Sequence, residues 1–203
     1  MSQFADRLLA VLRAPTAESF PALAAILVDE GFRRIEVTLS TAGGIDAIRS
    51  IRESAPDDVV VGAGSVTTVA QVHEASSAGA SFVVSPHTDQ AVVRAATALG
   101  LEVYPGAFTP TEVCAAWAAG VTAVKLFPAG RLGIGYLRDI RAPLPDIPLI
   151  PTGGIGLEDI GDWLDAGARA VGLGSVLQGD YHRTGDDAGL RARAALAVRN
   201  ASR

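Results

Sequence analysis

The chain has 203 residues, of which 49% are hydrophobic and 19% are charged, and its formal net charge is -5 at pH 7. This size and composition are typical of one globular domain with a sizeable apolar core. Lys and Arg form no cluster and only 5% of the residues are aromatic, which argues against nucleic acid and anionic membranes as partners. Because there is neither a membrane-spanning run nor a signal-peptide pattern, we expect a cytoplasmic protein.

Short apolar, β-branched runs recur along the chain and predict parallel strands buried on both faces. We expect these strands at residues 8–12, 34–39, 59–64, 82–86, 102–107, 123–128, 149–152 and 170–174. Stretches of helical period lie between them, for example at 16–30, 67–78, 89–99 and 157–166. Each of these stretches ends near a glycine that suits helix termination, and a last helix is expected after Gly185.

Eight such strand and helix units, spaced by roughly twenty to twenty-five residues, predict a single closed (β/α)₈ TIM barrel spanning residues 1–203. The first strand-to-helix loop has no G-x-G-x-x-G motif, which argues against a dinucleotide-binding doubly wound sheet. Barrel enzymes place their chemistry at the carboxyl ends of the strands, so we expect the polar residues at these ends to converge. They are Arg13, Glu36, Thr38, Ser40, Ser65, Ser85, His87, Thr109, Lys125, Thr152 and Ser175.

Lys125 is the only lysine among the 17 Lys and Arg residues, and it lies in an apolar segment at 121–128. Unlike arginine, a lysine in apolar surroundings can lose its proton, become nucleophilic and form a Schiff base with a carbonyl. The alternatives are a lysine whose ammonium extends from a strand end to solvent, or one that contacts a phosphate.

Glu36 lies between Ile35 and Val37 in the second predicted strand. A carboxylate there is costly to bury without a partner, so it is either paired with a cation or hydroxyl, or kept for proton transfer. Combined with Lys125, it favours a class I aldolase. An imine with a keto substrate makes the adjacent carbon–carbon bond cleavable when a base removes the proton of the hydroxyl on the departing carbon.

Glycines cluster after the seventh and eighth predicted strands, at 151–156 and 172–175. Backbone N–H groups can approach an anion closely there, as in the phosphate site common to these barrels. Two clusters at this pair of strands favour a phosphorylated substrate, and two tight turns are the alternative interpretation. Cys114, the single cysteine, excludes an internal disulfide and a cysteine metal cluster, and we expect it to be buried.

Two segments, GFRRIEVTL at 31–39 and GVTAVKLFPA at 120–129 followed by Gly133, resemble the signatures of a known family. It is the 2-keto-3-deoxy-6-phosphogluconate (KDPG) / 4-hydroxy-2-oxoglutarate (KHG) aldolase family. The strings at 61–65, 84–86, 104–106 and 151–154 also resemble its other strand ends, in the same order, so the resemblance covers nearly the whole chain.

The resemblance implies that Lys125 forms the imine with pyruvate and that Glu36 is the general acid and base, acting with a bound water. The partners it implies are small molecules: pyruvate, glyceraldehyde 3-phosphate and a 2-keto-3-deoxy-6-phospho acid. It implies no metal or other cofactor, and it implies a homotrimer. The implied pyruvyl-binding residues are Arg13, Ser65, Thr152, Pro86 and Phe127, and the implied phosphate-binding residues are Gly153, Gly154, Gly174 and Ser175.

Ser40 departs from the family pattern, because many members have an arginine at this position. Its loss removes a possible bidentate clamp for a carboxylate, so either Arg13 takes over that role or the substrate differs. The subgroup that acts on the 6-phosphogalactonate epimer also has a small polar residue there, which favours the galactonate substrate. Two other functions fit the same barrel: a phosphosugar isomerase or epimerase without a covalent intermediate, and a non-catalytic protein that binds a phosphorylated ligand.

Overall fold

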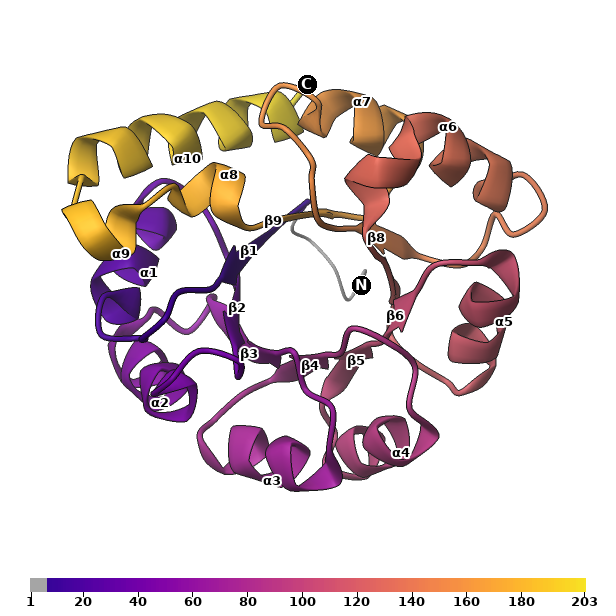
Figure 1. The fold of residues 1–203 in the computed structure, drawn as a ribbon, viewed down its shortest axis with the longest axis horizontal. Helices are drawn as coiled ribbons and strands as arrows, with labels where there is room; N and C mark the ends of the chain where they lie inside the picture. Colours follow the sequence, from indigo (N-terminus) through magenta and orange to yellow (C-terminus); the bar gives the residue numbers. More distant parts are fainter. Residues whose placement is uncertain (1–6) are drawn as a thin grey trace.

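The computed structural model describes residues 7–203, in which parallel strands curl around a common axis and helices lie outside them (Figure 1). Six strands form one sheet in the order β5-β4-β3-β2-β1-β9, and three form a second in the order β6-β7-β8. The strands are β1 (Leu8–Leu12), β2 (Arg34–Thr38), β3 (Val60–Gly64), β4 (Phe82–Val84), β5 (Glu102–Tyr104), β6 (Gly106–Ala107), β7 (Val124–Leu126), β8 (Leu149–Pro151) and β9 (Val171–Leu173).

Backbone hydrogen bonds also join the two sheets at both of their margins. On one side, the N–H of Lys125 in β7 donates to the carbonyl of Pro105, between β5 and β6, at 2.9 Å. On the other side, Thr152 and Gly172 form a parallel bridge between the ends of β8 and β9. The parallel α/β class predicted from the sequence is confirmed, and closure into one eight-stranded barrel stays a prediction.

The predicted strand at 102–107 is divided into β5 and β6 at Pro105. Proline has no backbone N–H and therefore cannot continue the ladder to β4, which explains the interruption. The other predicted strands match the observed ones to within two residues at each end.

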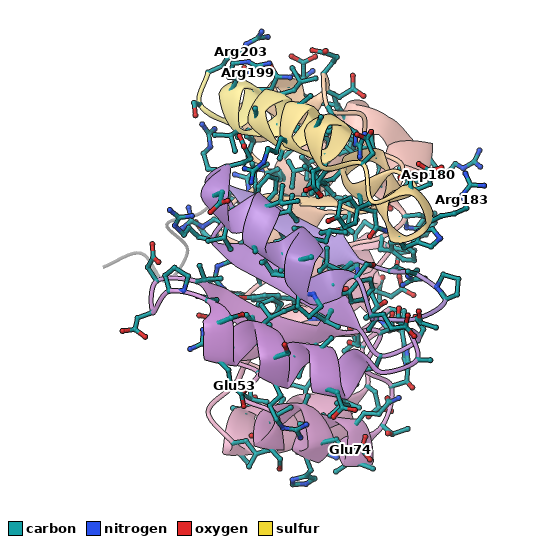
Figure 2. All side chains as sticks on the ribbon, turned by 90° about the vertical axis from the view of Figure 1, so that its left-hand side faces the viewer. Glu53, Glu74, Asp180, Arg183, Arg199 and Arg203 are labelled. Carbon is teal, nitrogen blue, oxygen red and sulfur yellow. The ribbon has the colours of Figure 1, made fainter. Side chains whose placement is uncertain are left out.

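Ten helices occur within residues 7–203 and surround the strands (Figure 1). Their outer faces carry charged side chains such as Glu53 and Glu74 (Figure 2). None of these helices is long and apolar enough to cross a membrane. The helices are α1 (Phe20–Asp29), α2 (Gly44–Ser54), α3 (Val69–Ser77), α4 (Gln90–Ala98), α5 (Pro110–Ala118), α6 (Ala129–Arg141), α7 (Ile160–Asp165), α8 (Ser175–Gln178), α9 (Tyr181–Thr184) and α10 (Asp187–Ala201).

Local sequence signals explain where several helices begin and end. Thr68 and Thr109 start α3 and α5 with capping boxes, in which the threonine and the Gln or Glu three residues later satisfy free N–H groups. Gly31 follows α1 with a φ of 105°, a left-handed conformation that side chains disfavour. The four-residue helices α8 and α9 were not predicted, because one turn shows no helical period in the sequence.

Two apolar clusters explain why the strands read as nearly continuous hydrophobic runs. The smaller cluster contains only residues from the strands and their starts, including Leu9, Val11, Phe82 and Ile150. The larger cluster packs the opposite strand faces, for example Leu8 and the other alternate residues of β1, against the helices. Side chains of alternating strand positions thus enter either the interior or the helix layer, and both faces are buried.

Candidate functional site

Lys125 lies in the middle of β7 and is buried, with 7% of its surface exposed. Its Nζ lies 3.8 Å from Oε1 of Glu36 in β2, a strand of the other sheet. The same Nζ lies 5.2 Å from the ring centre of Phe127, close enough for a cation–π contact. The structure therefore brings together the two residues on which the sequence-based hypothesis of imine chemistry depends.

Glu36 is completely buried, and neither carboxylate oxygen has a hydrogen-bond partner among the described residues. Burial raises the pKa of Glu36 because it disfavours the charged form, and the nearby charges of Lys125 and Arg13 oppose this rise less strongly. A carboxyl group that is dry, lacks hydrogen bonds and lies beside an amine can hold or accept a proton during a reaction.

Gly64, at the end of β3, lies against the Glu36 carboxylate and was not singled out from the sequence. A Cβ atom at this position would overlap Oε1 of Glu36, so only glycine leaves room for the carboxylate. The signal in the sequence was a glycine ending a buried strand, which indicates a close approach by another group without naming that group.

Arg13 follows β1, and its Nη2 donates a hydrogen bond of 2.9 Å to Oγ of Ser65, which follows β3. Ser65 has a φ of 57°, a left-handed conformation that is uncommon for residues other than glycine and is often found at functional sites. The backbone of Arg13 is bonded to the side chain of Gln178 in α8, a second residue that the sequence analysis did not identify. Ser40 is exposed and lies after β2.

Thr152 follows β8 and is buried, and its Oγ1 donates to the carbonyl of Ile150 at 3.3 Å. A Cβ atom at Gly172 would overlap this hydroxyl, so the glycine in β9 leaves the space that Thr152 occupies. Thr152 therefore lies at the carboxyl-terminal end of its strand, as Arg13 does at the end of β1.

The glycines predicted to bind phosphate lie in two neighbouring loops. Gly153 and Gly154 follow β8 with φ values of 87° and 76°, and the N–H of Gly130 donates to the carbonyl of Gly153 at 2.8 Å. Gly174 and Ser175 follow β9, where Ser175 is exposed and begins α8. The bridge between Thr152 and Gly172 holds the ends of β8 and β9 side by side.

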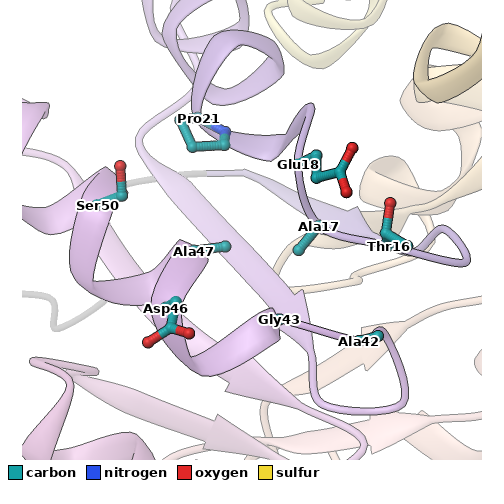
Figure 3. Close-up of a pocket in the computed structure, with 9 residues that line it drawn as sticks. All are labelled: Thr16, Ala17, Glu18, Pro21, Ala42, Gly43, Asp46, Ala47 and Ser50. Atoms are coloured by element: carbon teal, nitrogen blue, oxygen red, sulfur yellow. The ribbon is translucent and has the colours of Figure 1, made fainter.

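Pro86 and Phe127, predicted to form the apolar wall, line one pocket of about 290 Å³ together with Gly106. A separate groove of about 470 Å³ lies between the starts of α1 and α2 (Figure 3). Small side chains and the carboxylates of Glu18 and Asp46 line this groove, which contains none of the predicted site residues. Within residues 7–203, no group of three or more His, Cys, Asp or Glu could hold a metal ion.

The model of the KDPG and KHG aldolase family matches residues 3–188. The chain belongs to this family. A probable 2-dehydro-3-deoxy-6-phosphogalactonate aldolase of Rhizobium meliloti is 37% identical over 180 residues, which cover 88% of this chain and 85% of the relative.

Solved structures of aldolases resemble the fold closely. A structure described as native KDPGal has a TM-score of 0.90 at 32% identity, covering 98% of this chain and 95% of that one. The KDPG aldolase of Legionella pneumophila, with pyruvate captured as a covalent carbinolamine, has a TM-score of 0.85 at 27% identity. That match covers 95% of this chain and 94% of the Legionella chain.

Proposed function

We propose that the protein is a class I aldolase that reversibly cleaves a 2-keto-3-deoxy-6-phospho sugar acid to pyruvate and glyceraldehyde 3-phosphate. The observation that carries the proposal is the buried pair of Lys125 and Glu36, with Nζ 3.8 Å from the carboxylate. Membership of the KDPG and KHG aldolase family supports it, as does the covalent pyruvate carbinolamine of the Legionella relative.

In the proposed reaction, unprotonated Lys125 attacks the C2 ketone of the substrate, and loss of water from the carbinolamine gives an imine. Glu36 transfers protons during these steps and then accepts the proton of the C4 hydroxyl as the C3–C4 bond breaks. The electron pair of that bond moves into the imine and forms an enamine of pyruvate. Protonation of the enamine and addition of water release pyruvate and regenerate Lys125.

The remaining site residues bind and orient the two ends of the substrate. Arg13, Ser65 and Thr152 hold the pyruvyl carboxylate, for which the guanidinium offers charge and two parallel donors. Pro86 and Phe127 form the apolar wall. Gly153, Gly154, Gly174 and Ser175 hold the phosphate through backbone N–H and hydroxyl groups. This covalent route calls for no metal and no organic cofactor.

We further propose that the two sheets form one closed (β/α)₈ barrel and that the whole chain is a single domain. In this arrangement β5 and β6 are one strand interrupted at Pro105, and β8 is adjacent to β9. The hydrogen bond from Lys125 to Pro105 and the bridge between Thr152 and Gly172 support this closure. The homotrimer and the cytoplasmic location stay predictions.

We propose 2-keto-3-deoxy-6-phosphogalactonate as the preferred epimer. Ser40 supports this preference, because the subgroup that acts on this epimer has a small polar residue at the same position, and so does the name of the Rhizobium relative. With Ser40 exposed beyond β2, Arg13 is the cation at the strand ends that remains to bind the carboxylate.

The test compares steady-state cleavage of the 6-phosphogluconate and 6-phosphogalactonate substrates by the wild-type protein and by a Lys125→Arg variant. The release of pyruvate measures the rate. The variant keeps the positive charge but cannot form an imine, so we expect its kcat to fall by about 10³-fold or more. Near-normal cleavage by Lys125→Arg contradicts the covalent mechanism. If the wild-type protein cleaves neither substrate, it is not an aldolase of this type.

A further inference from the structure

We infer that Gln178 is a positioning residue that holds Arg13 in the orientation needed to bind the carboxylate of the keto acid. This inference rests on the proposed function, because it gives Arg13 a substrate carboxylate to bind. Gln178 is the last residue of α8 and is buried, with 7% of its surface exposed.

The side-chain amide of Gln178 bonds to both backbone polar groups of Arg13, which lies 165 positions earlier in the chain. Its Nε2 donates to the carbonyl of Arg13 at 2.8 Å, and its Oε1 accepts from the N–H of Arg13 at 3.3 Å. β1 ends at Leu12, so this amide satisfies the backbone just where the strand ladder stops. One side chain thus fixes the backbone from which the guanidinium extends.

Arg13 needs such support because it is exposed and its long side chain is flexible. Its Nη2 bonds to Oγ of Ser65, and its charge also acts on Glu36. A fixed backbone limits the directions available to the guanidinium, and preorganisation of this kind lowers the cost of binding a ligand.

Gln178 is itself held in place by the last helix. Arg193 in α10 donates from Nε to the carbonyl of Leu177 at 2.8 Å and from Nη2 to the carbonyl of Gln178 at 3.1 Å. A four-residue helix is not stable alone, so these bonds hold α8 against the rest of the molecule. A chain of contacts therefore runs from α10 through α8 to the end of β1.

A purely structural role for Gln178 predicts a different result from a positioning role. A general loosening of the fold would weaken the binding of every ketone, whereas misorientation of Arg13 would weaken only the binding of ketones that carry a carboxylate. Pyruvate and hydroxyacetone form this contrast, because both can form an imine with Lys125 but only pyruvate carries a carboxylate.

The experiment measures, for each ketone, the concentration at which borohydride traps the protein half-maximally as a covalent adduct. The intact mass of the protein detects the adduct. For Gln178→Met we expect this concentration to rise about tenfold for pyruvate and less than twofold for hydroxyacetone. Asn200→Leu is the matched control, since it removes another buried amide that bonds to a backbone carbonyl, that of Leu157 in the loop before α7. We expect it to leave the ratio of the two concentrations unchanged.

A double-mutant cycle with Arg13→Met tests whether Gln178 acts through Arg13. If it does, Arg13→Met/Gln178→Met matches Arg13→Met alone to within about twofold in pyruvate trapping. The inference is overturned if the effects of the two substitutions multiply. It is also overturned if Gln178→Met raises the half-maximal concentration equally for both ketones.

Arg193→Met provides a second approach if Gln178→Met does not fold, because it leaves the amide in place and removes only its anchor. We expect the ratio of pyruvate to hydroxyacetone concentrations to rise in this variant too, and an unchanged ratio overturns the inference. If wild-type protein is not trapped with pyruvate at all, the proposed function fails and this inference fails with it. Trapping of the wild type with an unchanged ratio in the variants refutes only the role of Gln178.

Discussion

Glu36 combines full burial with the absence of any hydrogen bond to its carboxylate from the described residues. Such a group is costly to keep unless another feature compensates, and Lys125 at 3.8 Å is the nearest opposite charge. A role in proton transfer explains why this cost is kept, because a carboxyl group already held by several hydrogen bonds transfers protons less readily.

Glu36→Gln tests this role directly. The variant keeps the shape of the side chain but cannot transfer a proton, so we expect kcat to fall by about 10²- to 10⁴-fold. The measurement is steady-state cleavage of the phospho sugar acid, with the melting temperature measured in parallel to show that the variant is folded. A kcat within threefold of the wild type would remove Glu36 from the mechanism.

The raised pKa of Glu36 also makes a prediction for the dependence of stability on pH. A carboxyl group whose pKa is higher in the folded state binds more protons there, so its contribution to stability is present below its unfolded pKa of about 4.3. That contribution is lost as the pH rises through the folded pKa. The free energy of unfolding of the wild type, relative to Glu36→Gln, should therefore fall as the pH rises above about 4.3.

Urea unfolding of both proteins across this range measures the difference. Glu53→Gln is the control, because Glu53 is an exposed carboxylate on α2 and we expect no such trend when it is replaced. A stability difference between wild type and Glu36→Gln that stays flat, or grows with pH, contradicts burial as the cause of the raised pKa.

At the scale of the elements, the close approach of β2 and β3 positions the carboxylate of Glu36 over Gly64. A Cβ atom at 64 would overlap Oε1 of Glu36, so Gly64→Ala must displace the carboxyl group or the strand. We expect it to cost about 1–3 kcal/mol of stability and to lower kcat by at least about tenfold, as measured by urea unfolding and steady-state kinetics.

Gly135→Ala in α6 is the matched control, because nothing lies within 4 Å of a Cβ atom at that position. It should leave kcat unchanged and be neutral or slightly stabilising, since alanine favours the helix by up to about 1 kcal/mol. Equal losses of kcat in the two glycine variants would show that the Gly64 effect does not depend on Glu36.

The sequence predicts elements well wherever burial repeats locally. The strand runs and the glycines after helices mark most boundaries to within a few residues. The predicted approach of Lys125 and Glu36 is also observed, although both lie in the middle of their strands and not at the ends. The sequence does not predict contacts between residues far apart in the chain, such as that of Gln178 with Arg13, because no local pattern marks them.

The predicted burial of Cys114 is wrong, because the buried side of α5 contains Val113 and Ala116 and leaves Cys114 exposed.

At the scale of the whole molecule, the choice between the two epimers depends on the groups that meet the C4 hydroxyl, since both epimers carry the same carboxylate. We expect kcat/KM for the 6-phosphogalactonate epimer to exceed that for the gluconate epimer by about 10- to 100-fold. One or two hydrogen bonds distinguish the epimers, and each buried partner left unpaired costs about 1–3 kcal/mol. Steady-state comparison of the two purified substrates measures the ratio, and a preference for the gluconate epimer refutes the role given to Ser40.

The general arrangement of the molecule was predictable because parallel strands bury both faces and therefore repeat one pattern along the chain. The division of the strands into two sheets was not predicted, since it depends on local features such as the interruption at Pro105. Family membership, shown by the match over residues 3–188, agrees with the resemblance of the two signature segments.

Covalent trapping of pyruvate tests the central claim most directly. Lys125 is the only lysine of the chain, so its side chain and the amino terminus are the only primary amines that can react. With pyruvate and borohydride, we expect the intact mass to increase by one reduced pyruvyl group, which peptide mapping assigns to Lys125, and Lys125→Arg to stay unmodified. An unmodified wild-type protein that still cleaves its substrate would contradict the imine mechanism.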